Sequence, residues 1–64
     1  MRKTFKINGT NYGIANNLVF PQEGIRYMLM VEGDDGWKPL KGFYTISEAV
    51  RYAKKIETEK KYGD

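Results

Sequence analysis

A run of consecutive large apolar side chains is the feature that most constrains this chain. Residues 26–33 read RYMLMVEG, whereas a strand with one face in water would alternate apolar and polar residues. One side of the expected strand carries Tyr27, Leu29 and Val31, and the other carries Met28 and Met30. Such continuous hydrophobicity predicts a strand in the centre of a sheet, and the methionine side must either be covered or bind something.

The first part of the chain predicts a β-hairpin over residues 1–14. Asn8-Gly9 stands between alternating apolar residues and suits a type I′ turn, because both turn positions take positive φ. In the resulting register, four apolar side chains share one face: Phe5, Ile7, Tyr12 and Ile14. Residues 15–24 combine asparagine, proline and glycine, so we expect a loop or edge segment that ends at Pro21.

A second hairpin is expected over residues 25–45. The turn GDDG separates the apolar strand from WKPLKGFYT, where Pro39 favours an edge position because proline cannot donate to a sheet ladder. Regular alternation divides the two strands into two faces. One face is expected to carry Tyr27, Leu29, Val31, Leu40, Gly42 and Tyr44. The other is expected to carry Arg26, Met28, Met30, Trp37, Lys41 and Phe43.

The clearest element is a helix over residues 46–62. Thr45 lies three residues before Glu48, a capping-box pattern that satisfies two free backbone donors at the start of a helix. An apolar stripe with Tyr52 at its margin is expected to pack on the sheet: Ile46, Ala49, Val50, Ala53 and Ile56. A polar face is expected to point away: Ser47, Arg51, Lys54, Lys55, Thr58 and Lys61. These elements predict a single α+β domain over residues 1–64, an antiparallel three- to four-stranded sheet packed against one C-terminal helix.

Composition limits the class of protein. The 64 residues include no cysteine and no histidine, so we expect no disulfide, no metal site and no cofactor. No run approaches the ~18 apolar residues of a membrane span and no signal peptide is recognisable, so a cytoplasmic protein without a membrane partner is expected. Eleven Lys and Arg against eight Asp and Glu give a net charge of +3. This mildly basic balance leaves the partner open between nucleic acid and protein.

An enzyme is not expected, and no catalytic residue is predicted. Ser47 is the single serine and lies in the helix cap, where it has no histidine to activate it. Asp34 and Asp35 stand between two glycines, so they are expected to serve the turn through bonds to their own backbone. The glycines of that turn lack the spacing of a phosphate-binding loop.

The sequence leaves open what residues 1–14 do to the methionine side of the sheet. If this hairpin folds over Met28 and Met30, it forms a second core layer. If it extends the sheet edge to edge, a patch rich in methionine, aromatic and basic residues faces solvent, which is typical of a partner-binding surface. The candidate partner-binding residues are Arg26, Met28, Met30, Trp37, Lys41 and Phe43. A secondary basic face consists of Arg51, Lys54, Lys55 and Lys61.

One part of the chain resembles a known family. From about residue 26 to residue 58, YMLMVEGDDGWKPLKGFYTISEAVRYAKKI gives a strand, an Asp-Gly turn, a strand and a Thr-capped helix with Glu-Ala after the cap. This order resembles the arm-type DNA-binding domain at the start of phage and transposon tyrosine recombinases. The resemblance implies a three-stranded antiparallel sheet backed by one helix, which reads the DNA major groove with its exposed face. It implies an accessory DNA-binding module.

The function predicted from the sequence is therefore non-enzymatic binding. The first expectation is a small protein of phage or mobile-element type that docks its sheet face on nucleic acid. One alternative is an inhibitor of a nucleic-acid-handling host or defence protein, similar in size and composition to anti-CRISPR proteins. Another is a homodimeric structural module. Salt separates the first two, because counterion release weakens nucleic-acid binding steeply while a hydrophobic contact is much less sensitive.

Overall fold

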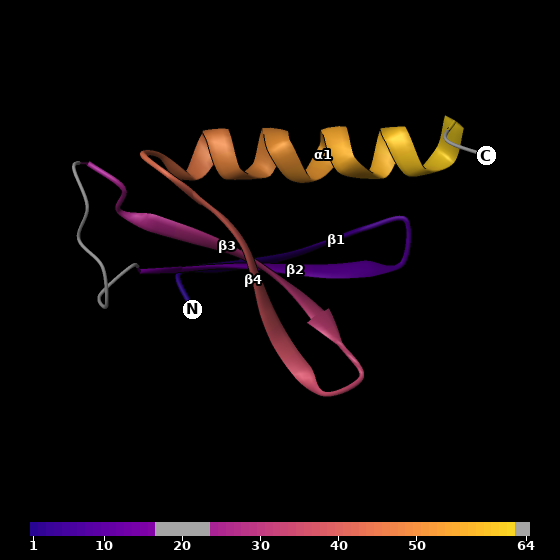
Figure 1. Ribbon diagram of the computed structural model, residues 1–64, viewed down its shortest axis with the longest axis horizontal. Coiled ribbons are helices and arrows are strands. Elements are labelled where there is room, and N and C mark those ends of the chain that lie inside the picture. The colour runs from indigo at the N-terminus through magenta and orange to yellow at the C-terminus, as the bar shows by residue number, and fades with distance from the viewer. Residues whose placement is uncertain (17–23, 63–64) are drawn as a thin grey trace.

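The sheet and helix expected from the sequence are both present. The computed structural model describes residues 1–16 and 24–62, and the side chains of residues 1–16 and 24–60. The elements are β1 (Lys3–Ile7), β2 (Thr10–Asn16), β3 (Tyr27–Gly33), β4 (Gly36–Phe43) and α1 (Ile46–Tyr62). The strands form one antiparallel sheet in the order β1-β2-β3-β4, and α1 lies across one face of it (Figure 1). The α+β class is therefore confirmed, with four strands in the sheet.

The hairpin of β1 and β2 has the predicted turn. Asn8 and Gly9 both have positive φ, 50° and 82°, as a type I′ turn requires. The register is also the predicted one, with these pairs: Lys3 with Ile14, Phe5 with Tyr12 and Ile7 with Thr10. β2 continues to Asn16, so the strand is longer than expected. The rest of the expected loop, including Pro21, lies outside the described residues.

The first hairpin extends the sheet and does not fold over it. β2 pairs with β3 in antiparallel fashion, with Tyr12 opposite Val31 and Ile14 opposite Leu29. Partners in a ladder share a face, so the apolar side chains of the first hairpin join the Leu29 side of the sheet. Of the two arrangements left open by the sequence, the edge-to-edge one is correct. No described element covers Met28 and Met30 from the other side.

The helix begins with the predicted capping box. The Thr45 backbone N–H donates to Glu48 Oε1 at 3.1 Å, and the Glu48 N–H donates to Thr45 Oγ1 at 3.2 Å. The core consists of Tyr12, Ile14, Leu29, Ala49 and Ala53, all fully buried. From the predicted apolar stripe, Ile46 and Val50 also pack against this core. Within the described residues, no helix is both long and apolar enough to cross a membrane.

A β-bulge in β4 overturns the alternation expected for this strand. Met30 pairs with Pro39 but Leu29 pairs with Lys41, so Leu40 has no partner across the ladder. Proline has no N–H to donate, and the extra residue beside it reverses the parity of the rest of the strand. Leu40 and Tyr44, which were expected in the core, are 43% and 57% exposed.

The same bulge moves two candidate site residues to the helix side. Lys41 and Phe43 now share the face of Leu29 and Tyr27, where Phe43 packs against the core. The expectation that both lie beside Met28 and Met30 is wrong. Trp37 precedes the bulge and keeps its expected side, since it pairs with Glu32.

Candidate functional site

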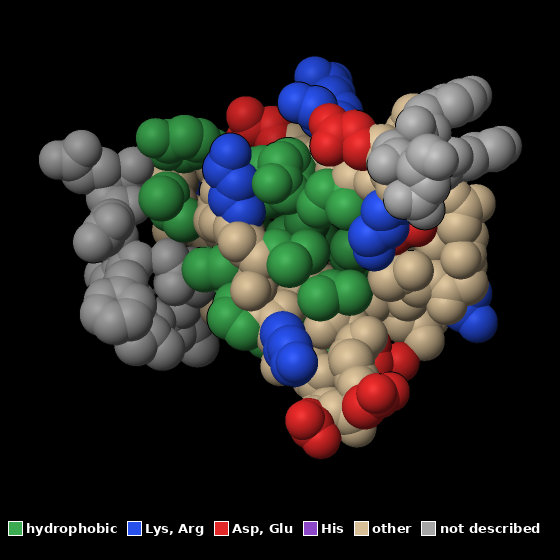
Figure 2. Space-filling view, turned by 45° about the vertical axis from the view of Figure 1, so that its right-hand side comes forward, with side chains coloured by type: hydrophobic (Ala, Val, Ile, Leu, Met, Phe, Trp, Pro, Cys, Tyr) green, Lys and Arg blue, Asp and Glu red, His purple; other side chains and the backbone are tan. Residues whose placement is uncertain are grey.

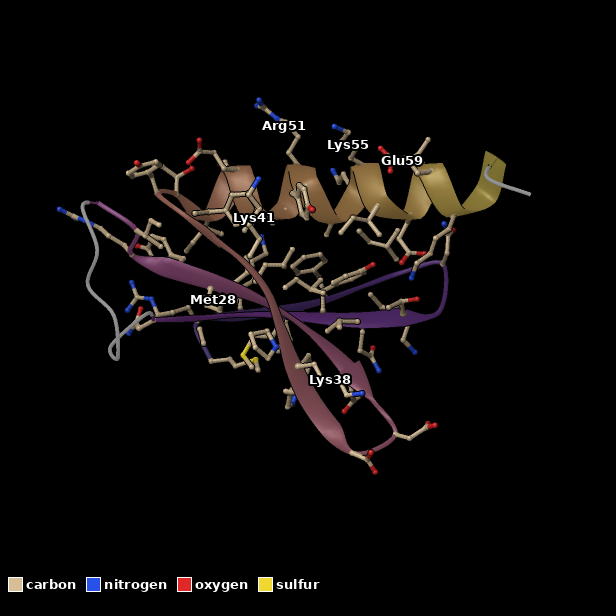
Figure 3. The ribbon with its side chains drawn as sticks, in the orientation of Figure 1. Met28, Lys38, Lys41, Arg51, Lys55 and Glu59 are labelled. Carbon is tan, nitrogen blue, oxygen red and sulfur yellow. The ribbon has the colours of Figure 1, made fainter. Side chains whose placement is uncertain are left out.

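The sheet face that turns away from α1 is not covered by any described element. Strand alternation and the ladder pairs place the following residues on it: Thr4, Lys6, Asn11, Gly13, Ala15, Met28, Met30, Glu32, Trp37, Pro39 and Gly42. Gly42 was expected on the Leu29 side, and the bulge moves it to this face opposite Met28. We call this surface the open sheet face. Figure 3 shows the labelled Met28 on the side of the sheet opposite α1. Since both methionines are only partly buried, the face presents apolar as well as polar groups to solvent.

One row of side chains crosses the open sheet face with a single residue from each strand. Lys6 pairs with Asn11 in the ladder, and Glu32 pairs with Trp37. Asn11 Nδ2 donates to Glu32 Oε1 at 2.7 Å and so joins the two pairs. With strands roughly 4.8 Å apart, the row spans about 14 Å. A cation, an amide, a carboxylate and an indole thus stand in one line, which we call the transverse row.

Beside the transverse row, Gly13 leaves a space that other side chains fill. A Cβ at Gly13 would overlap the Met1 side chain and would lie 3.2 Å from Trp37 Cζ3. Met1 and the indole therefore lie over the Gly13 backbone, yet Met1 is 57% and Trp37 36% exposed. The row borders a pocket of about 420 Å³ lined by Thr4, Phe5, Lys6, Asn11, Glu32 and Trp37.

Two exposed arginines stand at the starts of two strands that form this face. Arg2 and Arg26 are exposed and directly precede β1 and β3, where their backbone N–H groups donate to Ile14 and Phe43 at 2.8 and 3.1 Å. Among the described side chains, the one ion pair joins Lys60 to Glu57. The charges of Lys6, Arg2 and Arg26 are therefore not neutralised by a described partner.

The predicted site residues are divided between two surfaces. Met28, Met30 and Trp37 lie together on the open sheet face, and Arg26 precedes β3. On the helix side, Lys41 Nζ lies 5.7 Å from the Phe43 ring centroid and 5.1 Å from that of Tyr52. The six residues predicted as one patch thus do not form one.

The helix-side surface gathers part of the predicted basic face. A pocket of about 250 Å³ is lined by Phe43, Glu48, Arg51, Tyr52 and Lys55. Figure 3 shows Lys41 on the same side of the sheet as Arg51 and Lys55 of α1, and Figure 2 shows surface hydrophobic side chains with basic groups on either side. Lys54 instead lines a groove between β1 and α1 with Lys3, and the Lys61 side chain lies outside the described part of the chain.

The sequence patterns did not predict that one carboxylate is buried. Glu57 is 4% exposed and accepts a hydrogen bond from the Tyr12 hydroxyl as well as one from Lys60 Nζ at 3.3 Å. The Tyr12 bond lowers the pKa of Glu57 against the opposing effect of burial, while burial and this bond raise the pKa of Tyr12. Glu57 lies four residues after Ala53, which places it on the apolar stripe of α1. This helical spacing was the signal in the sequence from which its burial could have been predicted.

The described acidic residues do not gather into a metal site. No group of three or more histidine, cysteine, aspartate or glutamate side chains in residues 1–16 and 24–60 is placed to hold an ion. Asp34 and Asp35 are exposed in the turn between β3 and β4, where Gly33 pairs with Gly36.

Comparison with known proteins adds no relative. No protein-family model matches the chain, and no curated protein and no solved structure gives a significant match. The resemblance to recombinase arm-type domains therefore stays a prediction, and the functional proposal depends on the geometry of the open sheet face.

Proposed function

We propose that this protein binds nucleic acid through the open sheet face and catalyses no reaction. The observation that carries the proposal is the transverse row, which leaves a cation, an amide, a carboxylate and an indole uncovered on the open sheet face. Trp37 can stack on a base, Lys6 can contact a phosphate, and Asn11 with Glu32 can hydrogen-bond a base edge. Arg2 and Arg26 add positive charge for the backbone.

A second candidate is a protein partner on the same surface. Met1, Met28 and Met30 add flexible apolar contact area next to Trp37, and this composition favours protein interfaces. Such a partner includes a second copy of this chain. The two candidates differ in their dependence on salt.

Fluorescence anisotropy of labelled DNA and RNA strands tests the proposal. Binding should weaken steeply as salt rises, and Lys6→Glu should weaken it further because a phosphate contact becomes a repulsion. Lys54→Glu is the matched control, since it makes the same charge change on the exposed part of α1. Equal losses for the two variants would indicate nonspecific attraction. If no DNA or RNA strand binds, the nucleic-acid proposal is rejected. Self-association of the protein that is insensitive to salt would also reject it.

A further inference from the structure

The hydrogen bond between Asn11 and Glu32 fixes what the transverse row offers to a ligand. Asn11 donates one of its two Nδ2 N–H groups, which leaves the second N–H as a donor and Oδ1 as an acceptor, and Glu32 keeps its second carboxylate oxygen. No other hydrogen bond of these two side chains is found among the described residues. The centre of the row is therefore rich in acceptors, and it selects a ligand edge with adjacent donors.

We infer that the transverse row binds an unpaired guanine base of a single-stranded nucleic acid. This inference rests on the proposed function and names the ligand of the same surface. Guanine is the base whose Watson–Crick edge presents two adjacent donors, N1–H and the N2 amine, and these match a carboxylate. Adenine, cytosine and uracil or thymine each place an acceptor next to a donor on that edge.

The neighbours of the carboxylate complete the recognition. Trp37 pairs with Glu32 in the ladder, so its indole is beside the acceptors and can stack on the base or on its neighbour. Lys6 lies at the other end of the row, where its ammonium group can donate to guanine O6 or to a phosphate. The pocket of about 420 Å³ provides room for one base.

A single strand is required because duplex pairing occupies the edge that is read. In a duplex, N1–H and the N2 amine of guanine already bond to cytosine, so Glu32 would have no free donor to meet. Side-chain recognition of Watson–Crick edges is typical of proteins that bind unpaired bases. The inference therefore predicts binding to single strands and weak binding to a duplex of the same sequence.

The test uses the intact protein and strands about eight nucleotides long. Each strand is thymidine except for one central base, which is guanine, inosine, adenine or thymine. Inosine keeps N1–H and O6 but lacks the N2 amine, so it removes one donor. Trp37 is the single tryptophan, so its emission reports contact at the row while anisotropy of a labelled strand reports binding in general. The guanine strand should bind about tenfold more tightly than the others and change the Trp37 emission.

Two variants separate base reading from charge. Glu32→Gln replaces a carboxylate oxygen with a donor and should abolish the guanine preference. Asp34→Asn removes the same charge from the exposed turn and should strengthen binding of every strand slightly while keeping the preference. If Glu32→Gln behaves like Asp34→Asn, the carboxylate does not read the base and the inference is wrong.

The remaining outcomes distinguish the inference from the proposed function. Binding with no preference for guanine, or equal binding of the duplex, would overturn the inference while the nucleic-acid function stands. Binding of GMP as tight as that of the guanine strand would assign the site to a free nucleotide and would also overturn it. If the protein binds none of the strands, the proposed function is overturned, and the inference with it.

Discussion

Glu57 stands where an aliphatic residue would ordinarily complete the apolar stripe of α1. Its carboxylate is buried, and the hydroxyl of Tyr12 from β2 supplies the bond that makes this burial tolerable. Since the pKa of Glu57 is lowered in the folded state, its contribution to stability is complete above the ordinary value of 4.5 and is lost as the pH falls below it. The pKa of Tyr12 is raised, so its contribution is complete below its ordinary value of 10.0 and is lost at higher pH.

Tyr12→Phe tests this pair. The variant leaves a buried carboxylate without its main donor, so the free energy of unfolding should fall by about 1–3 kcal/mol at neutral pH. The further loss of stability in acid should be smaller than in the parent protein, because the pKa of Glu57 is no longer lowered by the bond. Urea unfolding across a pH series measures both effects. Tyr44→Phe is the control, since Tyr44 is 57% exposed, and identical profiles for the two variants would contradict the assigned role.

At the scale of the element, the start of α1 depends on its cap. Thr45→Ala removes the hydroxyl that accepts from the Glu48 N–H, and it should cost about 1 kcal/mol. Thr58→Ala removes the hydroxyl that donates to the Lys54 carbonyl within the helix, and it should cost little because alanine favours helix interiors. Thermal unfolding of the two variants gives the comparison. A larger loss for Thr58→Ala would show that the capping box contributes little.

A second prediction for an element follows from the bulge in β4. It concerns whether Phe43 or Leu40 contributes more to stability, and regular alternation would predict the opposite ranking. Phe43 packs on the core and its ring centroid lies 5.3 Å from that of Tyr52, so Phe43→Ala should cost roughly 2 kcal/mol, about half the loss at a fully buried site. Leu40 is 43% exposed, so Leu40→Ala should cost much less. Chemical denaturation measures both. A greater loss for Leu40→Ala would mean that β4 continues without the bulge.

At the scale of the whole molecule, α1 covers one face of the sheet and leaves the other open (Figure 1). The double change Met28→Thr with Met30→Thr should therefore lower stability only slightly, because threonine suits strands and both positions are partly exposed. Leu29→Thr is the matched control on the same strand, and it should cost several kcal/mol, since Leu29 is fully buried under α1. Melting temperatures provide the comparison. A loss for the double variant as large as for Leu29→Thr would show that the methionine side is covered.

Features that depend on neighbouring residues could be predicted from the sequence. The turn at Asn8-Gly9 follows from the backbone angles these residues accept, and it fixes the register of the first hairpin. The capping box and the apolar stripe of α1 follow from helical spacing in the same way. Alternation also placed Met28, Met30 and Trp37 on one face, because Trp37 precedes the bulge in β4 and β3 itself alternates without an extra residue.

Features that depend on contacts between distant segments could be seen only in the folded chain. The pairing of β2 with β3 determines that the first hairpin extends the sheet, and this same pairing brings Asn11 to Glu32. The bulge at Leu40 sends Lys41 and Phe43 to the helix side, because one unpaired residue reverses the parity of every position after it. Pro39 marks a position where the ladder of β4 is weakened, but local sequence does not fix which residue is left unpaired or which strand β2 pairs with. Both depend on how whole strands and the helix pack together. The open sheet face is therefore the product of a strand order that no single segment encodes.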